Sequence, residues 1–237
     1  MARKKIVVLS GAGVSAESGL MTYRDNGGMW DNYDPMEVAS IQGWCIDRKK
    51  VLDFYNGLRK RVQAVRPNDA HRLIASLEEK YDVKVITQNV DNLHERAGST
   101  SVLHLHGEVT KVRPENRCNE RDGYSEETVF DVGYDEVNLG DTAPNGCQLR
   151  PHIVFFGEAV PMIEKAADLV SQADIVLIIG TSLAVYPAAG LYRYASHDAR
   201  IFVIDPADVP LRDARVMHIR DVATTGMATF LEELEKI

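Results

Sequence analysis

The chain has 237 residues, of which 45% are hydrophobic and 26% are charged, and this is the balance of an ordinary globular protein with one core of normal depth. Its formal net charge is −8 at pH 7. An acidic chain is a poor candidate for sequence-independent binding to DNA or RNA, which needs clustered Lys and Arg.

The chain opens with a short apolar run at residues 6–9 that follows a basic start. The run is too short for the hydrophobic core of a signal peptide or for a membrane span, so we expect a cytoplasmic protein with no membrane partner. The three cysteines, Cys45, Cys118 and Cys147, are few and odd in number, and they do not indicate a disulfide framework.

Short apolar runs predict strands at residues 5–10, 83–87, 153–156, 174–179 and 200–204. They are uniformly apolar and do not alternate with polar residues, which is typical of strands buried on both faces. Helical patterns at residues 70–81, 160–172 and 225–237 lie between or after them. Strands that alternate with helices predict an α/β fold with a doubly wound parallel sheet.

Two stretches interrupt this alternation. Residues 27–67 read as helix and loop, with Trp30, Trp44, Phe54 and Tyr55 as candidates for a small core. Residues 108–150 are polar and rich in Asn, Asp, Glu and Gly, and they indicate an inserted lobe.

Polar and glycine-rich segments follow the predicted strands, at the ends where open α/β sheets bind ligands. GAGVSAESGL at residues 11–20 lets backbone amides approach a pyrophosphate, but it lacks the third glycine of the usual dinucleotide fingerprint. A tight strand-to-helix turn explains that segment equally well. TQNVDNLH at residues 87–94 places four polar side chains after a strand, and a polar loop with a helix cap is the alternative.

Three further segments complete the pattern. LHLHG at residues 103–107 places His104 and His106 on one face of a strand, and an imidazole can exchange a proton near neutral pH. His106 could be structural or catalytic, and the two rings together could be a metal pair, although no third metal ligand is evident. GTSLAVYPAA at residues 180–189 and RPHIVFFGE at residues 150–158 add small residues and an open strand end.

Taken together and in this order, these segments resemble the sirtuin family over nearly the whole chain. The matching segments are GAGVSAESGL, TYR, TQNVDNLH, LHG, RPHIVFFGE and GTSLAVYPAA. The resemblance implies one catalytic domain over residues 1–237. Its Rossmann-like core would comprise residues 1–26, 68–107 and 151–237, and its small lobe residues 27–67 and 108–150.

The resemblance also implies an enzyme that removes acyl groups, acetyl foremost, from protein lysines. NAD is consumed as a co-substrate, and the products are nicotinamide and O-acyl-ADP-ribose. The expected partner is therefore an acylated lysine of another protein, and neither a nucleic acid nor a membrane. An ADP-ribosyltransferase or NAD hydrolase on the same scaffold, a non-catalytic NAD sensor, and a hydride-transferring dehydrogenase are the alternatives.

By this resemblance, His106 is the general base that activates a ribose hydroxyl, and Asn89 and Asp91 shape the nicotinamide pocket. The other residues implied to bind NAD are Gly11, Ala12, Gly13, Ser15, Glu17, Thr22, Tyr23, Arg24, Trp30, Gln88, Gly180, Thr181, Ser182, Asp205 and Ala228. Those implied to bind the acyl-lysine substrate are Ala16, Tyr55, Leu58, Val154, Phe155, Phe156, Gly157 and Glu158. Either Phe155 or Phe156 is instead expected to pack in the core.

Two departures from the family pattern matter. Most sirtuins hold a structural zinc ion with two C-x-x-C pairs, whereas this lobe has only Cys118 and Cys147, so we expect no zinc. The branch that removes negatively charged acyl groups carries a Tyr-x-x-Arg pair, and here Leu58 follows Tyr55 at the Arg position. Arg59 would point about 100° away around the helix. An unpaired buried carboxylate is costly, so we expect acetyl or longer neutral groups, with removal of succinyl or malonyl groups as the alternative.

Overall fold

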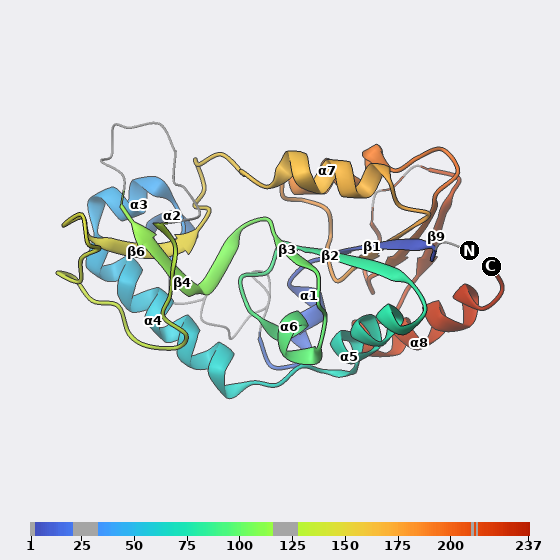
Figure 1. Ribbon diagram of the computed structural model, residues 1–237, viewed down its shortest axis with the longest axis horizontal. Helices are drawn as coiled ribbons and strands as arrows, with labels where there is room; N and C mark the ends of the chain where they lie inside the picture. Colours follow the sequence, from blue (N-terminus) through green and yellow to red (C-terminus); the bar gives the residue numbers. More distant parts are fainter. Residues whose placement is uncertain (1–2, 21–32, 116–127, 210, 212) are drawn as a thin grey trace.

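A six-stranded parallel sheet forms the centre of the computed structural model, which describes residues 3–20, 33–115, 128–209, 211 and 213–237 (Figure 1). Its strands are β1 (Lys5–Ser10), β2 (Asp82–Thr87), β3 (Val102–His104), β7 (Ile175–Ile179), β8 (Arg200–Ile204) and β9 (Val216–Ile219). The spatial order is β3-β2-β1-β7-β8-β9. Strand order therefore reverses between β1 and β7, and ligands of open α/β sheets bind at such a switch point.

Helices cover both faces of this sheet, as Figure 1 shows. They are α1 (Gly13–Ala16), α5 (Asp69–Ser76), α6 (Leu93–Ala97), α7 (Ile163–Ser171) and α8 (Ala223–Leu234), with 3₁₀ turns at η2 (Leu77–Glu79) and η4 (Ala188–Tyr194). Along β1, Ile6 and Val8 pack in the core beneath α5 and α8, while Val7 and Leu9 pack in the core beneath α7 and η4. Both faces of the strand are buried, which is why its sequence is continuously apolar.

The second part of the molecule is a smaller lobe at the end of the sheet away from the chain termini (Figure 1). It contains α2 (Pro35–Val38), α3 (Ile41–Ile46), α4 (Arg48–Ala64), and an antiparallel sheet of β4 (Gly107–Pro114), β5 (Phe130–Asp131) and β6 (Leu149–Ile153). Trp44, Phe54 and Tyr55 are buried in its core, as predicted, whereas Trp30 lies outside the described residues.

The predicted strand at residues 153–156 is wrong in its bounds, because β6 ends at Ile153. Only Phe156 of the later residues pairs, in an isolated bridge with Ser40. Pro151 lies inside β6, opposite Val112 and beside a register shift in β4. Proline has no N–H for the ladder and is tolerated in strands at such irregularities, so a Pro-containing run gives a weak strand signal.

Hydrogen bonds from two side chains stabilise the irregular part of the lobe between β5 and β6. The buried Asn56 on α4 donates to Val137 O and accepts from Val137 N, each at 3.0 Å. Gln148 donates to Asn138 O at 3.0 Å and accepts from Gly140 N at 2.7 Å. Within the described ranges, no three His, Cys, Asp or Glu side chains form a metal-binding group. Cys147 is a free thiol, and Cys118 lies outside those ranges.

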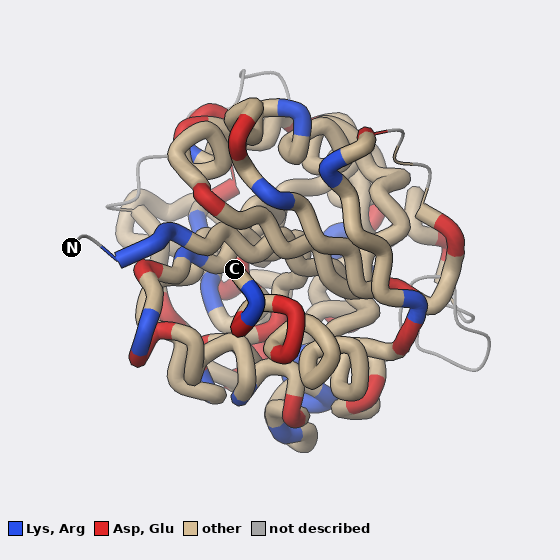
Figure 2. The backbone as a smooth tube through the Cα atoms, turned by 90° about the vertical axis from the view of Figure 1, so that its right-hand side faces the viewer, with Lys and Arg blue, Asp and Glu red and all other residues tan. Residues whose placement is uncertain are grey.

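The outer surface mixes charges of both signs. Figure 2 shows Lys and Arg interspersed with Asp and Glu on the face turned toward the viewer. Near the ends of the described chain, Lys4 Nζ donates to Ile237 O at 3.2 Å. No described helix has the length and apolar composition that crossing a bilayer requires.

Candidate active site

Glycines from two turns meet at the switch point, where open α/β sheets usually bind ligands in a crevice. Gly11 N donates to Ile179 O at 3.0 Å, and Gly13 N donates to Gly180 O at 2.9 Å. A Cβ atom on Gly13 would lie 2.7 Å from Gly180 Cα, and Gly180 itself has φ +62°. Side chains are therefore excluded where the β1 and β7 turns meet, and a backbone without side chains fits the close approach of a dinucleotide phosphate.

The β2–α6 loop (residues 88–92) brings buried polar side chains to the same crevice. Asn89 Nδ2 donates to Ser15 Oγ at 3.2 Å, and Ser15 Oγ donates to Asp91 Oδ2 at 3.1 Å. Asp91 Oδ1 accepts from Leu93 N at 3.0 Å. Burial raises the pKa of Asp91, although the hydrogen bonds from Leu93 and Ser15 oppose the rise. The predicted residues Ser15, Asn89 and Asp91 thus form one connected cluster.

His106 lies in the link between β3 and β4, with its ring against the β2–α6 loop. Its Nδ1 is 3.0 Å from Gln88 O. A carbonyl oxygen can only accept, so Nδ1 carries the hydrogen and Nε2 holds a lone pair. Burial lowers the pKa of His106, which keeps the ring neutral near pH 7. Gln88 Nε2 donates to Thr181 Oγ1 at 3.1 Å and so connects this loop to the β7 turn.

The predicted substrate segment at residues 154–157 runs beside His106, because Val154 N donates to His106 O at 3.0 Å. Its two phenylalanines separate as expected: Phe155 is buried in the lobe core, whereas Phe156 is 49% exposed. Glu158, predicted to contact the substrate, has a buried carboxylate that pairs with Arg150 at 2.6 Å and accepts from Phe155 N at 2.8 Å. It holds the segment in place from inside the lobe.

Tyr55 and Leu58, which are predicted to contact the acyl group of the substrate, belong to α4. Tyr55 is buried, Leu58 packs against the lobe core, and burial raises the pKa of Tyr55. Arg59 is fully buried, with Nε donating to Val109 O at 2.8 Å and Nη1 donating to Asn56 Oδ1 at 2.6 Å. Its guanidinium therefore bonds across the contact between α4 and β4, while its buried Nη2 has no hydrogen-bond partner among the described residues.

The remaining predicted NAD contacts are spread along the crevice. Glu17 accepts from Thr224 N at 3.0 Å and from Thr224 Oγ1 at 2.6 Å, so its carboxylate caps the start of α8. Asp205 Oδ1 accepts from Ala207 N at 2.9 Å in the turn after β8. Ala12 and Ala228 are exposed, and Ala16 and Ser182 are half-buried. Thr22, Tyr23, Arg24 and Trp30 lie outside the described residues.

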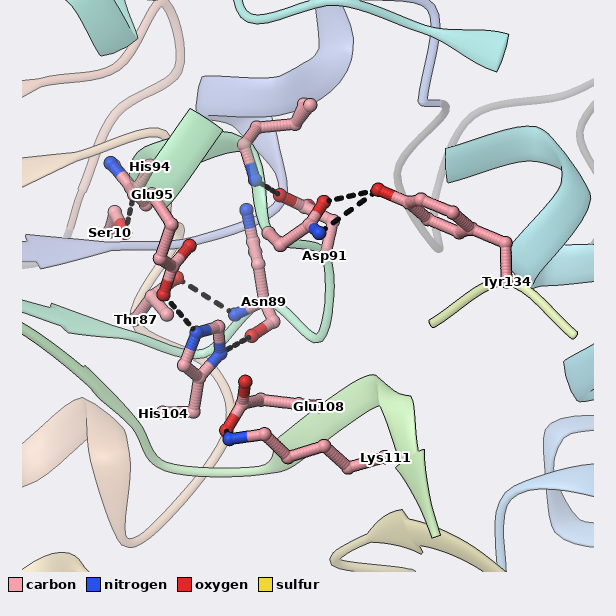
Figure 3. A network of polar contacts seen from close by, with 12 residues as sticks. Ser10, Thr87, Asn89, Asp91, His94, Glu95, His104, Glu108, Lys111 and Tyr134 are labelled. Carbon is pink, nitrogen blue, oxygen red and sulfur yellow. Dashed lines mark hydrogen bonds and ion pairs between the residues drawn. The ribbon is translucent and has the colours of Figure 1, made fainter. Parts of the chain in front are cut away.

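Several polar residues of this site escaped the sequence reasoning. Ser10 Oγ and His94 Nε2 are 2.9 Å apart, and the rings of His71 and His94 pack edge to face at 4.9 Å. His104, considered only as half of a metal pair, has both ring nitrogens engaged by protein atoms (Figure 3). A polar residue at the end of an apolar strand, as Ser10 is, was the available signal.

Comparison with known proteins identifies the family that this chain resembles. The Sir2 family model matches residues 11–187. An NAD-dependent protein deacylase of Bacteroides thetaiotaomicron is 50% identical, over 99% of this chain and 97% of its own. One from Helicobacter pylori is 54% identical, over 86% of this chain and 83% of its own. A crystal structure of a Sir2 homologue with NAD is 36% identical, has a TM-score of 0.84, and covers 99% of this chain and 90% of that one.

Proposed function

The chain belongs to the Sir2 family and is an NAD-dependent protein deacylase, and on this premise we propose that it removes acetyl and other neutral acyl groups from lysine side chains. The products would be free lysine, nicotinamide and O-acyl-ADP-ribose. The solved Sir2 structures that resemble this chain include complexes with NAD and with a deacetylated peptide, which supports a peptide-borne lysine as the second substrate.

The observation that carries the chemistry is the neutral ring of His106 beside both predicted substrate sites. Its Nδ1–H is held by Gln88 O, so Nε2 is free to accept the proton of a ribose hydroxyl. Bound NAD would supply the ribose carbon that becomes electrophilic as nicotinamide leaves. Asn89, Asp91 and Ser15 would enclose the nicotinamide, and Gly11, Gly13 and Gly180 would admit the phosphates.

The preference for neutral acyl groups follows from α4. A carboxylate at the end of a succinyl group needs a cationic partner once it is buried. Leu58 cannot supply one, and the guanidinium of Arg59 already donates to Val109 O and Asn56 Oδ1. Moving Arg59 toward the acyl group would break both hydrogen bonds and leave Val109 and Asn56 without that donor.

One experiment tests both parts of the proposal. The protein is incubated with NAD and matched acetyl-, butyryl- and succinyl-lysine peptides, and products are identified by mass spectrometry. We expect O-acyl-ADP-ribose, and kcat/KM for succinyl-lysine about 100-fold below that for acetyl-lysine, as an unpaired buried charge would give. His106→Ala should lower kcat by about 100-fold or more while NAD binding persists.

A matched pair of variants isolates the role of position 58. Leu58→Arg should raise turnover of the succinyl peptide, because it places a cation one helical turn from Tyr55, whereas Leu58→Met should leave the preference unchanged. Equal turnover of acetyl and succinyl peptides by the unmodified protein would refute the neutral preference. Free ADP-ribose or ADP-ribosylated protein as the main product would refute deacylation itself.

A further inference from the structure

Two histidines separated by one residue hold successive carbonyl groups of the β2–α6 loop. His106 Nδ1 is 3.0 Å from Gln88 O, and His104 Nδ1 is 2.9 Å from Asn89 O. Both rings therefore fix the backbone of the loop that carries Asn89 and Asp91. Figure 3 shows the ring of His104 between Asn89 and Glu95.

The second nitrogen of each ring has a different environment. His104 Nε2 is 2.8 Å from Glu95 Oε1 on α6, whereas no described carboxylate forms a hydrogen bond or ion pair with His106. A ring that faces a carbonyl on one side and a carboxylate on the other donates from both nitrogens and is an imidazolium. Only 7% of the His104 side chain is exposed, so this charge is held inside the protein.

The titratable and charged groups around His104 lie on four segments of the chain. The titratable and charged groups near it are His94 and Glu95 on α6, Asp91 on the β2–α6 loop, Glu108 and Lys111 on β4, and His152 on β6. Glu108 pairs with Lys111 at 2.7 Å. Burial lowers the pKa of both His94 and His152, which keeps those rings neutral. Among these groups, Glu95 is the anion in hydrogen-bond contact with His104.

We propose that His104, held by Glu95, is a positioning residue that fixes the Asn89 peptide group and thereby the side chains of Asn89 and Asp91. The inference rests on the proposed function, because these side chains are the ones assigned to the nicotinamide pocket. Asn89 is held at three points: its N donates to Thr87 Oγ1, its side chain donates to Ser15, and its carbonyl accepts from His104. Replacing His104 would remove the hydrogen bond that holds the Asn89 carbonyl.

The arrangement gives activity an alkaline limit. Burial alone would lower the pKa of His104, but the hydrogen bond and charge of Glu95, together with the charge of Glu108 and the Asn89 carbonyl, outweigh burial and raise it above 6.5. Below that raised pKa, the protonated His104 ring is held between Glu95 and Asn89 O. As pH rises through the pKa, the ring loses a proton and can no longer donate to both partners. The pKa of His106 is lowered, so its base form is present from below pH 6.5 upward. We therefore expect a bell-shaped dependence of kcat on pH. Protonation of His106 would cause the acid limb, and deprotonation of His104 would cause the alkaline limb.

The test compares pH profiles of kcat for NAD-dependent deacylation of one acetyl-lysine peptide. Glu95→Gln keeps a hydrogen-bond acceptor but removes the charge, so the alkaline limb should move to lower pH by about one unit or more. His104→Gln carries no titrating ring and should lose the alkaline limb, with kcat about 10- to 100-fold lower and KM for NAD changed less. His197→Gln is the matched control, because His197 is fully exposed.

NMR of the ring nitrogens gives a reading that does not depend on turnover. The His104 signal, identified by its loss in His104→Gln, should titrate above pH 6.5 in the unmodified protein and lower in Glu95→Gln. The side-chain amide signal of Asn89 should shift with the same midpoint. If the unmodified protein proved inactive, the proposed function would fail while this titration still decided the role of His104. Superimposable pH profiles of the unmodified protein, Glu95→Gln and His104→Gln would overturn the inference, as would a His104 ring that titrates below 6.5.

Discussion

Burial gives the imidazoles around the active-site crevice different protonation states. His71 and His94 pack against each other beneath Ser10 and Ser15, and burial lowers the pKa of His71 to about 4 and that of His94 well below its usual range. His104 has an acidic partner and keeps its proton. Chemically identical imidazoles therefore differ in pKa because their neighbours differ.

The neutral state of His71 makes stability depend on pH. The unfolded chain protonates this ring near pH 6.5, whereas the folded chain does so only near pH 4, so the stability contributed is present above 6.5 and lost as pH falls toward 4. The loss is roughly 3 kcal/mol in the free energy of unfolding.

Urea unfolding between pH 7 and 4 measures this contribution. His71→Gln should flatten the fall of the unfolding free energy with pH, because glutamine does not titrate. His197→Gln, at a fully exposed ring, should leave the fall unchanged. An equally steep fall in His71→Gln would show that other groups cause the acid sensitivity.

At the site, the sequence predicts which residues gather but not which atoms they engage. Ser15, Asn89, Asp91 and His106 converge because each follows the end of a parallel strand, and such ends share one edge. Glu17 was predicted to contact NAD, yet its carboxylate caps α8, over 200 residues further along the chain. A partner that distant leaves no local pattern in the sequence, so only folding reveals it.

Among the elements, the β1 and β7 turns meet so closely that no side chain fits between them. Gly180 has φ +62°, and a Cβ atom there would lie 2.3 Å from Val14 N. Gly133, in a turn of the small lobe, has φ +55° with nothing within 4 Å of such an atom. The two glycines share a backbone conformation and differ in the space around them.

Alanine at these two positions separates conformation from crowding. Gly133→Ala should cost about 1–2 kcal/mol in unfolding free energy, the usual cost of a left-handed non-glycine residue. Gly180→Ala should cost at least about 2 kcal/mol more and should weaken NAD binding, because the two turns must separate. Thermal unfolding and NAD titration of both variants check this, and equal costs would mean that the turns part easily.

The ends of a strand were predictable where both faces of the strand are buried. The bounds of β1 and β8 match the predicted runs because every residue after the exposed Lys5 and Arg200 is buried. Short strands were harder to predict: β5 has two residues, too few to show any period, and the strand expected to hold both His104 and His106 ends at His104. In β6, proline obscured a strand that its antiparallel pairing with β4 nevertheless supports.

On the scale of the whole molecule, the small lobe is built by packing and side-chain hydrogen bonds. Asn56 and Gln148 satisfy backbone groups of the segment between β5 and β6. The aromatic cluster of Tyr55, Phe54 and Phe155 supplies the apolar core beneath them, with ring centroids 5.1–5.9 Å apart.

Metal removal should therefore leave this protein intact. We expect an excess of a zinc chelator to change neither the melting temperature nor kcat, because structural zinc sites contribute folding energy only where ligands hold the ion. A sirtuin with both C-x-x-C pairs, treated in parallel, should lose stability. Elemental analysis that found one zinc ion per chain would contradict the expectation.

The central place of β1 has a consequence for biosynthesis. This strand leaves the ribosome first, yet one of its two flanking partners, β7, begins only at Ile175. At a synthesis rate of roughly 5–20 residues per second, one edge of the apolar strand β1 stays unpaired in the nascent chain for on the order of ten seconds or more. Such a chain would benefit from a chaperone at the exit tunnel, and synonymous codons that slow translation before Ile175 would prolong its exposure to aggregation.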